Sequence, residues 1–197
     1  TPQRYPPGHR MTADQTPAPS IRYRWTVLVM LTLVYTFNFI DRQILVILQE
    51  PIKADLGLSD AQLGLLTGFS FALVYVTAGI PIAWLADRSN RRNIVAVSLG
   101  IWSVMTALSG IVQNYTQLLL ARLGVGLCEA GGSPPSHSML SDYFREEQRG
   151  TALSIYTTGI YIGIFFGYFA GGWIADTYGW RNAFFIVGIP GVVLAFL

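Results

Sequence analysis

Charge is scarce in this chain. Asp, Glu, Lys and Arg together make up 12% of its 197 residues, whereas apolar residues make up 52% and the mean hydropathy is +0.43. Because a soluble globular domain carries about 25% charged residues, this composition is typical of a protein that lies in lipid. The sequence also lacks a cluster of basic residues with interleaved aromatics, so we expect no nucleic-acid partner.

Cysteine and histidine are nearly missing as well. The single Cys128 excludes a disulfide framework and a cysteine metal site, and the two histidines, His9 and His137, are too few for a usual metal centre. The chain has no Walker loop, no His-Glu-x-x-His motif and no Gly-x-Ser-x-Gly elbow. It also lacks a nucleophile–base pair, which argues against an intramembrane lipid enzyme. We therefore expect a protein that is not an enzyme and that uses no metal or other cofactor.

Long apolar runs are what the sequence does contain. A spanning helix needs about 20 mostly apolar residues. Six segments meet this condition, at about residues 24–49, 61–86, 93–113, 117–141, 149–174 and 181–197. We therefore expect an all-α membrane protein with six transmembrane helices. The last segment is still apolar at Leu197, so we expect the sequence to stop inside or just after a helix.

The polar start of the chain differs from the rest. Residues 1–20 contain five prolines, and we expect residues 1–22 to form a disordered tail that buries nothing. Met11 is a candidate natural start, so residues 1–10 are excluded from the expected fold. Residues 23–197 then form the membrane domain.

The basic residues are distributed unevenly between the two sides of the expected helices. Only Lys53 and Arg181 fall on one side. Seven arginines fall on the other side, namely Arg22, Arg24, Arg88, Arg91, Arg92, Arg145 and Arg149. The positive-inside rule places the arginine-rich side in the cytoplasm, together with the N-terminus.

Two pairs of charged residues interrupt the apolar runs: Asp41 with Arg42 in the first, and Arg122 with Glu129 in the fourth. A charged side chain at the centre of a bilayer costs roughly 2.5–3.5 kcal/mol on insertion scales, so these residues must pair with one another or face a wet cavity. Because Arg122 and Glu129 lie about 10 Å apart along one helix, each needs a partner elsewhere. We expect a cross-helix network in which carboxylates neutralise arginines, and either carboxylate is a candidate proton carrier. The alternative is a structural ion pair that only orients two helices.

Pro134 and Pro135 follow Glu129 closely and predict a kink in the fourth helix, because they remove two backbone donors and clash with the preceding turn. Such a kink is either a hinge that opens one end of a cavity or a static bend for packing. His137 stands alone, and we interpret it as an ordinary hydrogen-bonded histidine.

Four glycines in the fifth segment, Gly159, Gly163, Gly167 and Gly171, recur at intervals of four residues. This spacing places a flat stripe on one face of a helix, so that another helix can approach closely. We interpret the stripe as a packing or sliding surface without a catalytic role.

The loop after the second segment resembles the signature loop of the major facilitator superfamily, whose pattern is Gly-x-Leu-Ala-Asp-Arg-x-Gly-Arg-Arg. Ala83 and Asn90 stand where the family has glycines. The matching residues are Leu85, Ala86, Asp87, Arg88, Arg91 and Arg92. The resemblance implies that this loop forms a charge lock on the cytoplasmic side, with Asp87 and Arg91 as its main members, and favours the outward-open state. The alternative is a merely cationic loop that sets the topology.

Three further segments carry the resemblance. Arg122 and Gly126 match the family's fourth-helix motif Arg-x-x-x-Gly, which is associated with proton coupling. Residues 163–172 resemble the fifth-helix antiporter motif, although Tyr168 replaces its usual proline. The segments 38–43 and 128–134 resemble those of the bacterial spinster-like branch.

The resemblance covers about residue 21 to the end and implies two inverted three-helix repeats, in which helices one and four are symmetry mates that line a central cavity. It implies the N-terminal half of a twelve-helix transporter, monomeric and paired with its own C-terminal six-helix half in the bacterial inner membrane. We expect a proton-coupled secondary transporter working by alternating access on an amphiphilic anion or a lysolipid- or sphingolipid-like substrate. Its coupling and anion-recognition centre would be Asp41, Arg42, Arg122 and Glu129. The alternatives are a symporter of small organic acids in the same superfamily and a non-transporting membrane receptor or scaffold.

Overall fold

The computed structural model describes residues 20–197, apart from the side chain of Asp87. Within this range the chain is a succession of helices, in the order α1 (Ile21–Ile47), α2 (Gln49–Leu56), α3 (Asp60–Gly64), the π-helix η1 (Leu65–Phe69), α4 (Ser70–Arg88), α5 (Arg91–Ser109), α6 (Tyr115–Glu129), α7 (Ser133–Tyr143), α8 (Glu146–Tyr178) and α9 (Trp180–Leu194). The expected tail lies outside the described residues up to position 19. Its last residues belong to the helix, because the Ser20 hydroxyl accepts a hydrogen bond from the Tyr23 N–H and caps α1.

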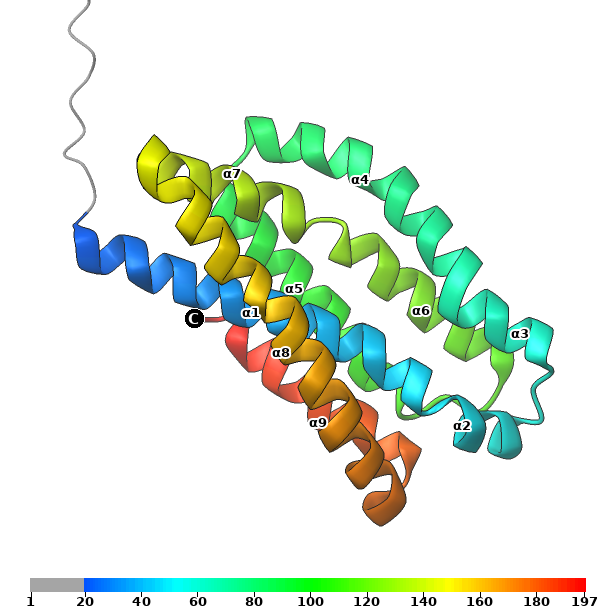
Figure 1. Ribbon diagram of the computed structural model, residues 1–197. Coiled ribbons are helices and arrows are strands. Elements are labelled where there is room, and N and C mark those ends of the chain that lie inside the picture. Colours follow the sequence, from blue (N-terminus) through cyan, green and yellow to red (C-terminus); the bar gives the residue numbers. More distant parts are fainter. Residues whose placement is uncertain (1–19) are drawn as a thin grey trace, which may run out of the picture.

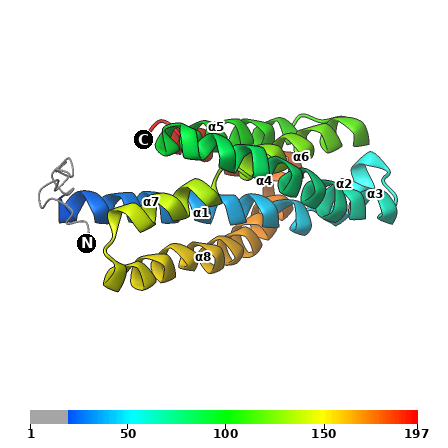
Figure 2. The same cartoon turned by 90° about the horizontal axis from the view of Figure 1, so that it is seen from above.

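The long helices run side by side in an elongated bundle (Figures 1 and 2), with α8 packed along α1, α9 along α5, and α6 between α4 and α5. Among the described residues, four helices are long and apolar enough to cross a membrane: α1, the continuous run Asp60–Ala86, α5 and α8. The shorter α9 is also apolar. The six expected segments therefore correspond to α1, the run from α3 to α4, α5, α6 with α7, α8 and α9.

The fourth expected segment is broken rather than bent. After Glu129 the chain makes a turn over residues 130–132, and α7 starts at Ser133. Pro134 and Pro135 occupy the first turn of α7, where their missing N–H groups have no partner inside a helix. The two prolines thus begin a new helix instead of kinking a continuous one.

The glycine stripe of α8 faces α1. An added Cβ at Gly163 would lie 2.6 Å from the Thr36 carbonyl oxygen and 2.7 Å from the Phe39 Cβ. A second close contact, not expected from the sequence, joins α9 to α5, where a Cβ at Gly188 would lie 2.7 Å from the Ser103 carbonyl oxygen. The backbone of α8 thus lies almost in contact with that of α1, and the backbone of α9 almost in contact with that of α5.

Two apolar clusters hold the bundle at its two ends. One contains Leu28 of α1 and Trp102 of α5, whereas the other contains Ile44 of α1 and Leu118 of α6. The first charged pair of the sequence falls on α1 between these clusters. The core therefore encloses a polar layer between two apolar ones.

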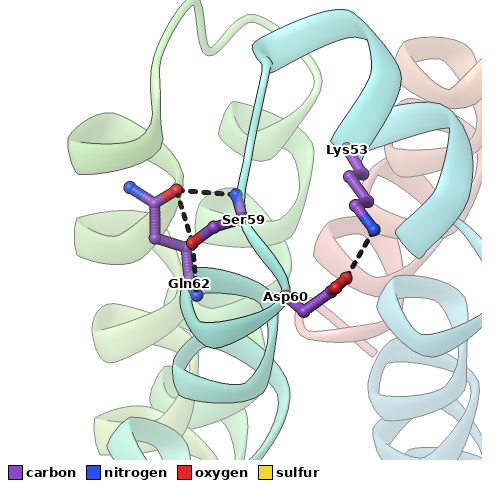
Figure 3. Close-up of polar contacts among 4 residues, drawn as sticks. All are labelled: Lys53, Ser59, Asp60 and Gln62. Atoms are coloured by element: carbon purple, nitrogen blue, oxygen red, sulfur yellow. Dashed lines mark hydrogen bonds and ion pairs between the residues drawn. The ribbon is translucent and has the colours of Figure 1, made fainter.

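The end of the bundle that carries α2 is fastened by polar contacts (Figure 3). Ser59 and Gln62 form a capping box at the start of α3, and Lys53 Nζ donates to Asp60 Oδ1 at 2.5 Å. This hydrogen bond, together with the charge of Asp60, raises the pKa of Lys53.

Candidate functional site

Asp41 lies in the last third of α1 and is 2% exposed. Its Oδ2 accepts a hydrogen bond of 2.5 Å from the Thr106 hydroxyl of α5, and its Oδ1 lies 3.6 Å from Nη1 of Arg122 on α6. Arg122 itself is 3% exposed, and the Phe184 ring of α9 covers it at 5.3 Å. Four helices therefore enclose this carboxylate and its counter-charge.

Arg42 follows directly on Asp41 but contacts a different partner, because neighbouring residues of a helix are rotated by about 100° around its axis. Its Nε donates a hydrogen bond of 2.8 Å to Oε2 of Glu129 at the end of α6. The Glu129 side chain is fully buried, whereas the Arg42 side chain is 27% exposed. A buried anion is thus neutralised by a cation that retains access to the surface of the half-bundle.

Aromatic rings surround the guanidinium of Arg42. Its Cζ lies 5.3 Å from the ring centre of Phe39, 5.2 Å from that of Phe71 and 4.9 Å from that of Tyr75. The Phe71 ring reaches this position because Gly126 leaves room for it: a Cβ there would lie 3.1 Å from the Phe71 Cδ2. Cation–π attraction holds an arginine among such rings.

The four charged residues expected from the sequence are therefore brought together in two pairs. Arg42 meets Glu129, and Arg122 meets Asp41. Three neutral neighbours were not singled out by the sequence, namely Phe71, Tyr75 and Thr106. Uncharged residues of these types are common in apolar helices, so the sequence carries no signal that would have singled them out.

His137 is an exposed residue of α7 whose Nδ1 lies 2.8 Å from the Ser133 carbonyl oxygen. Its ring stands edge-on to Tyr156, with 5.1 Å between the centres, and Tyr156 stacks on Tyr35 at 4.3 Å. These contacts agree with an ordinary hydrogen-bonded histidine. Within the described part of the chain, no group of three or more His, Cys, Asp or Glu side chains could hold a metal ion.

The expected charge lock lies where α4 ends and α5 begins. Arg91 forms an ion pair with Asp142 near the end of α7, and Arg91 and Arg92 line a groove there. Arg88 lies over the Trp84 ring, with its Cζ 3.8 Å from the ring centre. The loop is therefore tied to α7 through one arginine.

One member of the expected lock, the side chain of Asp87, lies outside the described residues. The described ion pair of Arg91 is with Asp142, which the sequence does not single out because it sits among other charged residues of a connecting segment. Nothing in its immediate sequence distinguishes it from solvated neighbours.

Most of the chain resembles known transporters. Residues 31–197 match the family profile of the Major Facilitator Superfamily. An "MFS-type efflux pump" of Mycolicibacterium smegmatis is 41% identical over 174 residues, which cover 88% of this chain and 41% of that protein. The "Probable galactarate/D-glucarate transporter GudP" of Bacillus subtilis is 32% identical over 190 residues, which cover 93% of this chain and 42% of that protein.

The fold is shared with a solved structure. The crystal structure of a bacterial homolog of the human lysosomal transporter Spinster, inward-facing and unoccupied, matches with a TM-score of 0.80 and 40% identity over 90% of this chain and 43% of that one. This match confirms the expected all-α fold of an N-terminal transporter half. The chain spans about two fifths of the length of these relatives. Since the family profile covers residues 31–197 and the fold is shared at 40% identity, the chain belongs to the major facilitator superfamily.

Proposed function

We propose that this chain works, together with its own C-terminal six-helix half, as a proton-coupled secondary transporter that operates by alternating access. The coupling and substrate-recognition centre consists of Asp41, Arg42, Arg122 and Glu129. One observation carries the proposal: a fully buried carboxylate, Glu129, depends for its counter-charge on Arg42, which is 27% exposed. A charge at bilayer depth is expensive and marks a pathway more often than it stabilises a fold.

This contact supports a simple mechanism of coupling. When Glu129 takes up a proton, Arg42 loses its counter-charge and becomes free to bind an anion. When an anion binds Arg42 first, Glu129 takes up a proton more readily. Because such linkage is reciprocal, proton and anion bind together and cross on the same step. The alternative is antiport, which the fifth-helix motif suggests and in which proton uptake expels the substrate.

The rings around Arg42 support an amphiphilic anion, such as a lysolipid or a sphingolipid-like molecule, as the substrate. The charged head would lie on the guanidinium, and the apolar part would lie against Phe39, Phe71 and Tyr75.

A second candidate is a symporter of small organic acids. The relative from Bacillus subtilis is named for galactarate and D-glucarate, and an arginine binds a small carboxylate as readily as it binds a lipid headgroup. A thermal-shift panel of lysolipids against sugar acids, on the full-length protein, separates the two. If the protein is instead a non-transporting receptor, neither lysolipids nor sugar acids will show counterflow.

The decisive test is substrate-dependent proton flux in liposomes that contain the full-length transporter. Glu129→Gln keeps the shape of the side chain but cannot ionise, so we expect the pH dependence of transport to flatten. Glu50→Gln, at an exposed acid of α2, is the matched control and keeps the wild-type profile. An unchanged profile in Glu129→Gln would exclude this residue as the proton carrier.

The orientation in the membrane is part of the same proposal. The connections α4–α5 and α7–α8 carry arginines, whereas Lys53 and Arg181 lie at the other end of the bundle. We place the arginine-rich end and the N-terminus in the cytoplasm of a bacterium, with the protein as a monomer in the inner membrane. Reporter fusions to a connection at the arginine-rich end and to one at the opposite end of the bundle test this placement.

The gate at that end is formed by Asp87, Arg88, Arg91 and Arg92, and it acts through the ion pair of Arg91 with Asp142. The turn between α6 and α7 is the hinge, because Pro134 and Pro135 let α7 tilt without breaking intrahelical hydrogen bonds. Asp142→Asn should increase the labelling of a cysteine on the cytoplasmic side of the cavity. Unchanged labelling would argue that the pair is only structural.

A further inference from the structure

Five buried atoms in the charged layer find no hydrogen-bond partner among the described residues. They are Asn38 Oδ1, Asp41 Oδ1, Glu129 Oε1, and Nε and Nη2 of Arg122. Each of these four residues is at most 4% exposed. An unsatisfied buried polar atom costs roughly 1–3 kcal/mol, and native proteins keep few of them. A cluster of this kind therefore points to a ligand that satisfies it.

The chemistry of the atoms selects the ligand. Three of them are oxygen acceptors and two are guanidinium donors. A cation among the oxygens would be repelled by Arg122, and an anion on the guanidinium would be repelled by two carboxylates, so neither kind of ion suits the whole set. Water can donate to the first set and accept from the second, and it commonly satisfies otherwise unpaired buried groups.

The distances place the water on one side of the layer. Thr106 bonds Asp41 directly at 2.5 Å, and Arg42 bonds Glu129 directly at 2.8 Å. Arg122 Nη1 and Asp41 Oδ1, in contrast, are 3.6 Å apart, which is beyond a direct hydrogen bond and within the reach of a bridging water.

Asn38 lies one helical turn before Asp41 on the same helix, so the two side chains lie on one face of α1. We propose that α1 and α6 enclose internal water that hydrogen-bonds Asn38, Asp41, Arg122 and Glu129, with Asn38 as the residue that positions it. The inference rests on the proposed proton coupling. In a transfer step, the protonated Glu129 gives its proton to the internal water, and each water molecule passes on one of its own protons until the Asp41 carboxylate receives one. Every O–H bond that breaks is matched by one that forms on the next oxygen atom, and the water remains neutral.

The groups that face this layer limit what can titrate there. Besides Asp41 and Arg42, α1 contributes the amide of Asn38, and α5 contributes the hydroxyl of Thr106. The remaining groups are Arg122, Cys128 and Glu129 of α6, Tyr75 of α4 and the Phe184 ring of α9. Asn38 carries no charge itself, so it can act only through the water that it holds.

The test replaces Asn38 by Leu, which has a similar shape but no polar atom. In liposomes with the full-length protein, we expect proton-driven uptake to slow by at least about 10-fold, with loss of its solvent deuterium isotope effect. Substrate counterflow, which needs no net proton movement, should stay within about 2-fold of wild type, because the substitution leaves Arg42 and its hydrogen bond to Glu129 in place. Thr36→Val is the matched control, since Thr36 is a buried polar residue of the same helix whose hydroxyl already donates to the Thr32 carbonyl at 2.9 Å.

Each alternative gives a different result. Equal loss of counterflow and proton-driven uptake in Asn38→Leu, or retention of both with the isotope effect, would overturn the role of Asn38. If Asn38→Leu does not fold, Asn38→Ser is the variant to use, because serine keeps a polar group. We expect Asn38→Ser to retain the isotope effect. Loss of the isotope effect in Asn38→Ser would contradict the proposal. Uptake that requires sodium rather than choline would show a cation in place of water. Failure of the proposed function is distinguishable, because wild-type protein would then move no protons at all.

Discussion

Arg42 and Glu129 are joined across α1 and α6 by a hydrogen bond of 2.8 Å, although they lie 87 positions apart in the chain. The pair is asymmetric, since the carboxylate is fully buried and the guanidinium is 27% exposed. In the mechanism that we propose, a substrate approaches the cation from this exposed side. This asymmetry is the structural basis of the coupling that we propose.

Arg42→Met removes the counter-charge of a buried carboxylate and should lower the stability of the protein by about 3–5 kcal/mol. The double variant Arg42→Met, Glu129→Met leaves no unpaired charge and should recover most of that loss. Unfolding in detergent micelles measures both. Equal stability of the single variant and wild type would show that the pair contributes nothing to the fold.

Gly163→Ala should weaken the packing of α8 on α1. The added Cβ would approach the Thr36 carbonyl oxygen to 2.6 Å, so the helices must separate, at a cost of about 1–3 kcal/mol. Gly172→Ala is the control, because nothing lies within 4 Å of a Cβ at that position. Thermal unfolding of the two variants should differ clearly; similar melting temperatures would contradict the close approach.

Gly188→Ala should disturb both the fold and transport. Its Cβ would lie 2.7 Å from the Ser103 carbonyl oxygen and from the Ala107 nitrogen, on either side of the Thr106 that bonds Asp41. We expect a loss of about 1–3 kcal/mol in stability together with slower transport. Gly79→Ala, where a Cβ meets open space, serves as the comparison, and a Gly188→Ala protein that transports normally would argue against the link.

Arg181, in the first turn of α9, contacts α2 and the connection between α5 and α6. It donates to Asp55 Oδ2 at 2.5 Å and to the Val112 carbonyl oxygen at 3.2 Å. Both charged side chains are well exposed, so solvent screening limits the ion pair to about 0.2–1 kcal/mol. A double-mutant cycle of Arg181→Met and Asp55→Asn should give a coupling energy in this range that falls as salt is added. A coupling energy that does not change with the salt concentration would be inconsistent with an exposed ion pair.

The helical segments followed from the apolar runs, because each run is long enough to cross lipid and needs no partner to be recognised. The break between α6 and α7 did not follow in full. The sequence placed two prolines just past Glu129, but whether they bend a helix or start one depends on how the preceding residues pack. Here a Cβ at Gly131 would lie 2.2 Å from the Ser98 Oγ of α5, and the chain turns where α5 leaves room only for glycine.

The sequence by itself determined the membrane class, the helical segments and the identity of the four buried charges, since a charge inside an apolar run is visible in one dimension. Only the tertiary structure decided which carboxylate meets which arginine. Adjacent residues such as Asp41 and Arg42 point in different directions on a helix, so their partners depend on how the neighbouring helices are placed around α1. Thr106 became recognisable only through its hydrogen bond to Asp41, and Asn38 only through the burial of its unpaired amide oxygen, because their chemistry matters solely inside the folded bundle.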